Sequence, residues 1–515
     1  MSTVQIQKEQ KQELHTKLWE MANELRGNME AYEFKNYILG LIFYRYLSER
    51  TETYVKELLV HDKKSYLDAW QDEETREVLV AESLLKLGYV IEPQYLFSHV
   101  IEMIEKGTFG VDYMEKIITS ITESTQGQDS QQDFDGLFED MDLKSSKLGR
   151  EIKQRSKLIG TILKTIDTID FHLENMELDV LGDAYEYLIG MFAQTAGKKG
   201  GEFYTPVQMS KLVARLATLG YHNIPSVFDC ACGSAGLLLQ VGKYSRVGQY
   251  FGQELTSTTY NLARMNMLLH GIPYQNFEIR NCDTLENPHF EDRLFTVQVA
   301  NPPYSTSWSA NPKFLDDDRF SSYGKLAPKG TADFAFVQHM IHHMADDGRV
   351  VVLLPHGVLF RGNAEEAIRK YLVKDLNYLD AVIGLPSNCF QGTSIPVCCL
   401  VFKRERNGNS GNVCFIDASK YYTSGKNQNA MSEDDIERII QAYGERKEIE
   451  KFCHIAPLAE IEENDYNLNI PRYVDTFEPE EEVDLQAVKK SIRGHKEEIA
   501  KLETELHSIF DELGV

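Results

Sequence analysis

The feature that most constrains the fold is an alternation of short apolar, β-branched runs with helical stretches from about Leu178 to residue 475. The runs that predict strands are residues 226–229, 295–300, 349–354, 379–383 and 397–402. Helical stretches such as 257–270 and 332–344 separate them. This alternation predicts a Rossmann-like α/β fold, a mostly parallel sheet with helices on both faces. In such folds ligands bind at the carboxyl ends of the strands.

The chain before this region has a helical pattern instead. Two series of apolar residues are spaced as on one face of a helix: Leu14, Leu18, Ala22 and Leu25, then Phe34, Ile38, Leu41 and Ile42. We therefore predict an all-helical N-terminal domain over 1–170 and an α/β catalytic domain over 171–475. A polar stretch between Ser124 and Gly149 predicts a loop or hinge within the helical part.

Residues 476–515 predict a third element, a C-terminal coiled-coil helix. Its core positions, three and four residues apart, are Leu485, Val488, Ile492, His495, Ile499, Leu502, Leu506, Ile509 and Leu513. They span about four heptads with charges between them. A helix that packs on its own domain has the same pattern. Because Pro471 and Pro479 separate this helix from the preceding domain, we favour a helix for partner-subunit assembly.

A small-residue turn follows the first predicted strand of the sheet. The strand ends in Asp229, Gly233 and Gly236 follow, and a helix begins. Glycines at these positions allow the backbone to approach a ligand closely. By the logic of dinucleotide sites, such a turn binds an adenosine cofactor beside the start of the helix. A tight strand-to-helix turn without a ligand has the same pattern, so this motif alone leaves both interpretations open.

Two further acids follow predicted strands. Glu254 comes 18 residues after Gly236, where an acid can accept a hydrogen bond from a ribose hydroxyl. A helix N-cap acid is an equal alternative for Glu254. Asp283 is placed to accept from an adenine amino group. Together with Asp229, these acids at three strand ends predict a pocket for the adenosine and methionine parts of S-adenosylmethionine.

The sharpest motif is Asn301-Pro302-Pro303-Tyr304, directly after the predicted strand 295–300. An exocyclic aromatic amine is a poor nucleophile because its lone pair is delocalised into the ring. The side-chain oxygen of Asn301 and the carbonyl of Pro302 can accept both amino hydrogens and favour a pyramidal nitrogen. The prolines stiffen the loop, and Tyr304 offers a face on which a base extruded from the duplex can stack. A rigid turn without chemistry is the alternative. The position after a strand and downstream of the glycine loop favours catalysis.

These motifs, in this order, resemble those of the modification (M) subunits of type I restriction-modification systems, which are N6-adenine DNA methyltransferases of the gamma group. Residues 229–236 resemble the family's glycine loop, with Cys230 where proline is common and Ala235 where glycine or alanine occurs. Residues 200–206 resemble an upstream motif that contacts the methionine part of the cofactor, and 301–304 match the catalytic motif. Other family-like segments are 25–45, 181–190, 386–396 and 467–473.

The resemblance implies a site-specific, adenine-specific DNA methyltransferase that uses S-adenosyl-L-methionine and no metal. The cofactor-binding residues that it implies are Glu202, Phe203, Tyr204, Thr205, Pro206, Val207, Asp229, Gly233, Ser234, Ala235, Gly236, Glu254 and Asp283. The implied catalytic residues are Asn301, Pro302, Pro303 and Tyr304. Tyr304 and Phe390 are the implied stacking walls for the flipped base, although a buried core phenylalanine is an equal alternative for Phe390.

The resemblance also implies partners. A specificity (S) subunit reads the DNA sequence and meets the C-terminal helix, two copies of this chain flank one specificity subunit, and a restriction (R) subunit joins the assembled complex. The formal net charge of −25 agrees with this arrangement, because a protein that holds DNA unaided needs a basic face. No apolar run is long enough to cross a bilayer, and residues 1–10 lack the apolar core of a secretion signal, so we expect a cytoplasmic location.

Two other functions fit part of the pattern. Protein glutamine N5-methyltransferases also use Asn-Pro-Pro-Tyr, but they are shorter and do not explain the helical domain or the C-terminal helix. A non-catalytic assembly subunit with a decayed pocket is the other alternative, and the intact acids and catalytic motif argue against it. An N4-cytosine target is disfavoured because those enzymes usually have serine at the position of Asn301.

Overall fold

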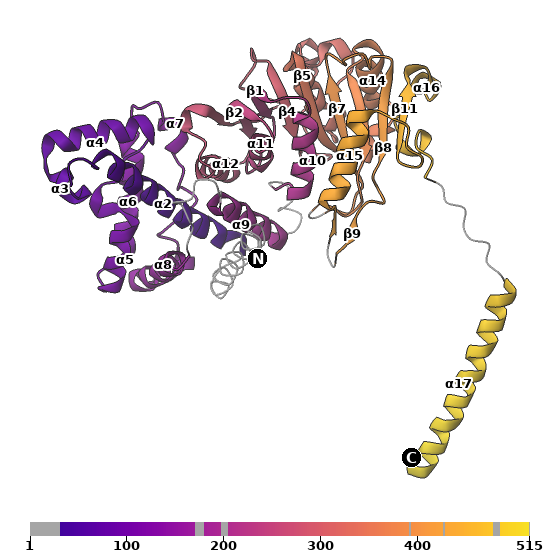
Figure 1. The fold of residues 1–515 in the computed structure, drawn as a ribbon, viewed down its shortest axis with the longest axis horizontal. Coiled ribbons are helices and arrows are strands. Elements are labelled where there is room, and N and C mark those ends of the chain that lie inside the picture. The colour runs from indigo at the N-terminus through magenta and orange to yellow at the C-terminus, as the bar shows by residue number, and fades with distance from the viewer. Residues whose placement is uncertain are drawn as a thin grey trace. The chain divides into compact units, whose positions relative to one another are not determined.

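The computed structural model describes residues 31–169, 180–196, 204–390, 393–425, 428–476 and 485–513. The chain divides into two compact units, 1–474 and 475–515. The first unit contains a helical region followed by an α/β region (Figure 1). The first predicted helical series, 14–25, lies outside the described residues.

The helical region is built around one long helix, α2 (Ala31–Leu58). Its neighbours are α3 (Tyr66–Gln71), α4 (Glu73–Lys86), α5 (Phe97–Glu105), α6 (Val111–Ser124), α7 (Gln131–Phe134) and α8 (Ile152–Asp167). The predicted series Phe34, Ile38, Leu41 and Ile42 is buried on α2. Almost every described side chain from 34 to 48 is buried, because other helices and the α/β region cover α2 on several sides.

The polar stretch predicted as a loop or hinge is a packed connection. It contains only short helical turns, as a loop should, but Phe134, Leu137, Phe138 and Met141 are buried. The Asp140 carboxylate accepts hydrogen bonds from Thr258 and Asn261 of helix α12 (Ser257–Leu269). The apolar side chains and these polar contacts fasten the stretch to the α/β region, so its interpretation as a hinge is wrong.

The α/β region holds a nine-stranded sheet in the order β11-β8-β6-β7-β5-β4-β1-β2-β3. The strands are β1 (Asn223–Asp229), β2 (Arg246–Glu254), β3 (Phe277–Asn281), β4 (Phe295–Ala300), β5 (Met344–Pro355), β6 (Leu379–Gly384), β7 (Val397–Lys403), β8 (Asn412–Asp417) and β11 (Cys453–Pro457). β7 runs antiparallel to β5 and β6, and β11 runs antiparallel to β8. The other pairs are parallel, which confirms the predicted mostly parallel sheet. A short hairpin, β9 (Thr423–Ser424) and β10 (Asn429–Ala430), stands apart from this sheet.

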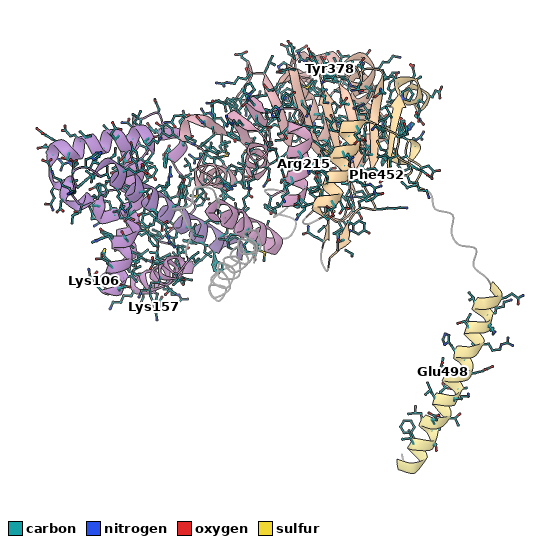
Figure 2. The ribbon with its side chains drawn as sticks, in the orientation of Figure 1. Lys106, Lys157, Arg215, Tyr378, Phe452 and Glu498 are labelled. Carbon is teal, nitrogen blue, oxygen red and sulfur yellow. The ribbon has the colours of Figure 1, made fainter. Side chains whose placement is uncertain are left out.

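Helices cover both faces of the sheet (Figure 1). One face packs against α10 (Val207–Thr218), α11 (Gly236–Gly242), α12 and α15 (Glu433–Glu445), and the other against α13 (Asp333–His342) and α14 (Ala364–Lys370). On β5, Val351 and Leu353 belong to the first core, while Val350 and Val352 belong to the second. Burial on both faces explains why such strands read as continuous apolar runs. Arg215 of α10 (Figure 2) also forms an ion pair of 2.6 Å with a carboxylate of α15.

The strand order reverses between β1 and β4. Strands β2 and β3 continue from β1 to one side, and β4 and β5 continue to the other. In an open parallel sheet, the loops that leave the strands at such a point diverge and leave a crevice at their carboxyl ends. Val227 of β1 pairs with Val297 of β4. The residues that follow these two neighbouring strands therefore meet at one edge of the sheet.

The described residues of the second unit form one helix, α17 (Leu485–Leu513), so the predicted C-terminal helix is confirmed. Apart from Phe510, six of its apolar side chains are between 42% and 58% exposed: Val488, Ile492, Ile499, Leu502, Leu506 and Ile509. They belong to the predicted heptad series. Its role in assembly stays a prediction. Over the described ranges, no helix has both the length and the apolar character of a membrane span.

Candidate active site

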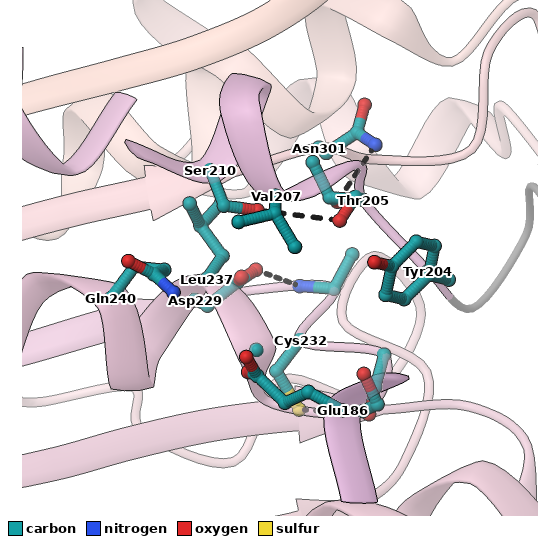
Figure 3. Close-up of a pocket in the computed structure, with 14 residues that line it drawn as sticks. Glu186, Tyr204, Thr205, Val207, Ser210, Asp229, Cys232, Leu237, Gln240 and Asn301 are labelled. Carbon is teal, nitrogen blue, oxygen red and sulfur yellow. Dashed lines mark hydrogen bonds between the residues drawn. The ribbon is translucent and has the colours of Figure 1, made fainter. Parts of the chain in front are cut away.

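A pocket lies at the carboxyl ends of β1 and β4, where the strand order reverses (Figure 3). Its walls come from α9 (Val180–Ala196), from α10 and the residues before it, from the glycine loop, and from the residue after β4. The lining residues are Glu186, Tyr204, Thr205, Val207, Ser210, Asp229, Ala231, Cys232, Gly233, Ser234, Gly236, Leu237, Gln240 and Asn301. The empty space among these residues, including the part open to solvent, is about 490 Å³.

The glycine loop is a tight turn that hydrogen bonds fasten to β2. Gly233 has a φ of 54°, in the left-handed region that glycine adopts without strain, and Ala235 has a φ of 63°. The N–H of Cys232 donates to the carbonyl of Gln253 at 2.9 Å, and the N–H of Gly233 donates to the Glu254 carboxylate at 3.1 Å. Glu254 therefore holds the turn in shape.

Asp229 ends β1 inside the pocket and is 1% exposed. One of its carboxylate oxygens accepts the N–H of Ala231 at 2.9 Å. Burial, with a smaller contribution from the negative charge of Glu254, raises the pKa of Asp229 to about 8. Burial also raises the pKa of Glu254. Burial and a nearby negative charge both disfavour the ionised form of Asp229, and a cationic ligand group beside this carboxyl would favour the ionised form.

Glu254 and Asp283 lie at the ends of β2 and β3 but do not line this pocket. Glu254 accepts the N–H of Thr256, the residue that caps α12, at 2.8 Å. Asp283 accepts the N–H groups of Leu285 and Glu286 at 2.9 and 3.1 Å. Both acids thus stabilise the turns after their strands, and their contacts with a cofactor stay predictions.

The catalytic motif presents Asn301 to the pocket in a defined orientation. The Nδ2 group of Asn301 donates to Oγ1 of Thr205 at 3.0 Å, and its Oδ1 accepts the hydroxyl of Tyr304 at 2.6 Å. Pro302 is buried and Pro303 is exposed. The chain turns sharply at Ser305, where φ is 50°. These contacts join the upstream motif around Thr205 to the catalytic motif, although 96 residues separate them in sequence.

Two residues from distant segments fix the end of this loop. The N–H of Ser305 donates to Oδ1 of Asp333 at 2.8 Å, and Arg361 donates to Oδ2 of Asp333 at 2.9 Å. Asp333 is 1% exposed and begins α13. The N–H of Ala332 also donates to the carbonyl of Thr306 at 2.9 Å. The sequence motifs gave no indication of this support.

Phe390 lies beside Tyr304, with their ring centroids 6.1 Å apart and their planes at 73°. Phe390 is 5% exposed, whereas Tyr304 is half-buried, and burial raises the pKa of the Tyr304 hydroxyl. Both interpretations of Phe390 therefore keep support, since it is a buried residue that also stands next to the proposed base-stacking ring. Its role toward a base stays a prediction.

Most of the residues predicted for the cofactor gather at the pocket. Tyr204, Thr205, Val207, Asp229, Gly233, Ser234 and Gly236 line it. Pro206 caps α10, and Ala235 stands within the glycine loop. Glu202 and Phe203 lie outside the described residues. Lining residues that sequence reasoning missed include Glu186, Ser210 and Gln240. Glu186 lies within the family-like segment 181–190, but helical spacing alone does not indicate which of its residues face a ligand.

Comparisons with known proteins agree with the motifs of this sequence. Residues 176–482 match the family described as N-6 DNA Methylase, and residues 14–166 match the family described as HsdM N-terminal domain. The chain is 37% identical to the type I restriction enzyme MpnII methylase subunit of Mycoplasma pneumoniae, over 98% of this chain and 97% of that protein. It is 30% identical to the type I restriction enzyme MjaVIII methylase subunit of Methanocaldococcus jannaschii, over 98% and 85%.

A solved structure is similar over nearly the same length. It is the type I restriction-modification system methyltransferase subunit from Streptococcus thermophilus, with 43% sequence identity and a TM-score of 0.84. The match covers 90% of this chain and 100% of that chain. The likeness therefore includes both the helical region and the α/β region.

Proposed function

Because this chain belongs to the DNA N6-methylase subunits of type I restriction-modification systems, we propose that its pocket binds S-adenosylmethionine and that Asn301 presents the N6 amino group of an extruded adenine to it. The observation that carries this proposal is the placement of Asn301 and Asp229. They follow neighbouring parallel strands and line one pocket together with the glycine loop. If Asn301 lay far from the glycine loop, it could not present an amino group to a cofactor bound there.

The residues around the pocket suit this cofactor. The left-handed Gly233 and the small residues Ser234 and Gly236 leave room for close approach. Among the described residues, the lining includes two carboxylates, from Glu186 and Asp229, and no lysine, arginine or histidine, which suits a ligand with cationic groups. When bound, S-adenosylmethionine supplies an electrophilic methyl group on its sulfonium. We assign the ribose hydroxyls to Glu254 and the adenine amino group to Asp283.

The chain's own residues align the acceptor for direct, in-line transfer. Oδ1 of Asn301 and the carbonyl of Pro302 accept the two hydrogens of the adenine amino group, which localises the nitrogen lone pair toward the methyl group. Thr205 keeps the Asn301 amide in the orientation that leaves Oδ1 for the base. Tyr304 provides the stacking face. Positioning of this kind supplies rate without a covalent enzyme intermediate.

The chain works as one subunit of a complex, in keeping with the relatives that it matches. We assign sequence recognition to a specificity subunit that binds α17, with two copies of this chain per specificity subunit and a restriction subunit that joins the assembly. The exposed apolar side chains of α17 support an intermolecular helix contact. The net charge of −25 supports the view that the specificity subunit makes most of the contacts that hold DNA.

The test is a transfer assay with methyl-labelled S-adenosylmethionine, the specificity subunit and DNA that contains its site. We expect label in N6-methyladenine, and a loss of at least roughly 100-fold in rate for Asn301→Ala, with cofactor affinity retained. Label in protein instead of DNA would support the glutamine methyltransferase alternative. Failure of the wild-type chain to bind the cofactor in calorimetry would support the non-catalytic alternative.

A further inference from the structure

An exposed phenylalanine lies at the carboxyl edge of the sheet. Phe360 belongs to the connection between β5 and α14, residues 356–363, and is 48% exposed. The other described phenylalanines of the first unit are buried, except the half-buried Phe109. Single exposed apolar side chains are common on protein surfaces. The function of Phe360 therefore has to be argued from its position.

The residue after Phe360 contacts the catalytic loop. Nη1 of Arg361 donates to Oδ2 of Asp333 at 2.9 Å, and its Nη2 donates to Oγ of Ser305 at 3.5 Å. Ser305 directly follows Tyr304, whose ring we assign to the extruded base. Phe360 thus lies on a loop that touches the loop proposed to receive the base.

Hydrogen bonds fix the backbone on both sides of Phe360. The carbonyl of Leu359 accepts the N–H of Leu468 at 2.9 Å, and the carbonyl of Arg361 accepts Nη1 of Arg369 at 3.0 Å. Leu359 is 0% exposed and Arg369 is 3% exposed, so both contacts are anchored in the protein interior. A loop that is already ordered loses little conformational entropy when a partner covers its exposed ring.

The exposed apolar surface continues on the neighbouring connection, residues 385–396. The N–H of His356 donates to the carbonyl of Pro396 at 3.1 Å, which joins the two connections. Ile395, next to Pro396, is 54% exposed. Phe360 and Ile395 therefore belong to adjacent connections at one edge of the sheet, and Phe360 is the one whose neighbour contacts the catalytic loop.

The charge of this edge suits DNA as the partner. Three connections lie at the carboxyl ends of β5, β6 and β8: residues 356–363, 385–396 and 418–432. None of them contains an aspartate or a glutamate, although the chain has 79 of these residues. The next acid after Phe360 along the chain, Glu365, is buried and pairs with Arg361. In a chain with a net charge of −25, an edge without carboxylates is a place where phosphates can approach.

Extrusion of a base creates a need for an apolar side chain at this place. The base that leaves the stack exposes the faces of the neighbouring base pairs, and this unstacking costs free energy. Proteins that unstack DNA insert apolar side chains between base steps, phenylalanine among them. Such a side chain has to stand exposed beside the pocket that takes the base, on a loop that is held in place. Phe360 meets these conditions.

We infer that the ring of Phe360 enters the gap that the target adenine leaves in the duplex and stacks on the neighbouring base pairs. This inference rests on the proposed function, because it presupposes that an adenine is extruded toward Asn301. Phe360 is a positioning residue in this role, since it stabilises the extruded state and does not touch the amino group or the methyl group that react.

The experiment compares two duplexes in single-turnover methylation with the specificity subunit and saturating S-adenosylmethionine. One has thymine opposite the target adenine, and the other has an abasic position there. An unpaired adenine leaves the stack at lower cost, so the ring should matter less. We expect Phe360→Ala to slow methylation of the paired duplex by about tenfold or more and of the abasic duplex by less than about threefold.

Leu294→Ala is the matched control. Leu294 is 56% exposed and directly precedes β4, at the opposite edge of the sheet, so neither rate should change. A second readout uses 2-aminopurine at the target position, whose fluorescence rises when the base leaves the stack. In the paired duplex, Phe360→Ala should reduce this rise, while affinity for S-adenosylmethionine in calorimetry should not change.

Three results would overturn the inference: equal slowing on both duplexes, an unchanged rate on the paired duplex, or loss of co-elution with the specificity subunit, which would make Phe360 a protein contact. If Phe360→Ala does not fold, Phe360→Leu removes the aromatic face and keeps an apolar side chain. It should slow the paired duplex more than the abasic one, and equal effects again overturn the inference. If wild type methylates neither duplex, the proposed function itself fails.

Discussion

The hydroxyl of Tyr304 donates a 2.6 Å hydrogen bond to Oδ1 of Asn301, the oxygen that we assign to the adenine amino group. A base that enters the site must therefore share this oxygen with the tyrosine or displace its hydroxyl. The tyrosine hydroxyl thus holds the asparagine amide in place before a base arrives, and its ring is the surface on which we expect that base to stack.

Two substitutions separate the hydroxyl of Tyr304 from its ring. Tyr304→Phe keeps the stacking face, so we expect the single-turnover methylation rate to stay within about threefold of wild type. Tyr304→Ala also removes the ring, and because base stacking is worth about 1–3 kcal/mol, we expect a loss of roughly ten- to a hundredfold. A phenylalanine variant as slow as the alanine variant would show that the hydroxyl, and not the ring, matters.

Thr205 orients Asn301 from the other side of the amide. Thr205→Val keeps the shape and removes the oxygen that accepts the Nδ2 group of Asn301, so the amide loses one of the two hydrogen bonds that orient it. We expect the methylation rate at saturating cofactor to fall by roughly tenfold. Thr205→Ser retains the oxygen and should restore the rate. If the valine variant loses cofactor affinity but keeps its maximal rate, Thr205 acts in binding and not in orientation.

Asp333 supports the catalytic loop through the N–H of Ser305 and is itself held by Arg361. Asp333→Asn weakens both contacts at a buried position. We expect a loss of about 1–3 kcal/mol in the free energy of unfolding, together with slower methylation. Glu365→Gln is the matched control, since Glu365 also pairs with Arg361 but has no bond to the loop. It should lower stability with little effect on rate. If the two variants changed the rate equally, Asp333 would not be a residue that positions this loop.

Asp133 makes stability depend on pH. Burial raises its pKa from 3.8 to about 7, against the opposing charge of Arg264, which donates instead to the carbonyls of Gln132 and Asp135. Between these values the native protein holds a proton that the unfolded chain has released, so the contribution of Asp133 to stability is fully present below about pH 4 and is lost as pH rises through about 7. The whole shift corresponds to roughly 4 kcal/mol.

Asp133→Asn removes this titration. We expect the melting temperature of the variant to gain on that of wild type as pH rises from 5 to 8, measured side by side at each pH. Other titrating groups cancel in this comparison because both proteins contain them. A constant difference in melting temperature across this range would contradict the assignment of the raised pKa to Asp133.

We expect assembly with the specificity subunit to depend on the exposed apolar side chains of α17. Replacing Ile499 and Leu502 with lysine should abolish co-elution with the specificity subunit, because burial of these side chains would supply much of the contact. The melting temperature of the first unit should not change, because α17 belongs to a separate compact unit. Lys489→Ala with Glu503→Ala changes exposed positions outside the apolar series and should leave the complex intact. Unimpaired assembly of the lysine variant would rule out this helix as the contact.

Local patterns predicted most of the strands of the sheet but not its full order. Runs such as 295–300 and 397–402 are buried on both faces, so their composition alone indicates a strand. The insertion of β7 antiparallel between β5 and β6 depends on contacts between residues far apart in sequence. The strands β8 and β11 complete one edge of the sheet and were not predicted, since Cys453–Pro457 is short and carries little β-branched character.

The residues of the candidate site were likewise predicted only in part. Asn301 and Asp229 were predicted because the chemistry of each motif is concentrated in a few consecutive residues after a strand. Asp333 and Glu186 were missed because they lie on helices, where spacing shows which residues are apolar but not which polar residue faces a pocket or a loop. Tertiary structure alone brings them to the loops that they contact.

Arg264 connects the helical region to the α/β region, so the chain cannot be divided between the two regions without losing its contacts. Arg264 is 1% exposed on α12, and its Nη1 group donates to the carbonyls of Gln132 and Asp135. A fragment that begins after the helical region would leave this cation without these two acceptors. In chimeras between relatives, residues 131–140 and α12 should therefore be exchanged together. We expect a hybrid that exchanges only one of them to misfold.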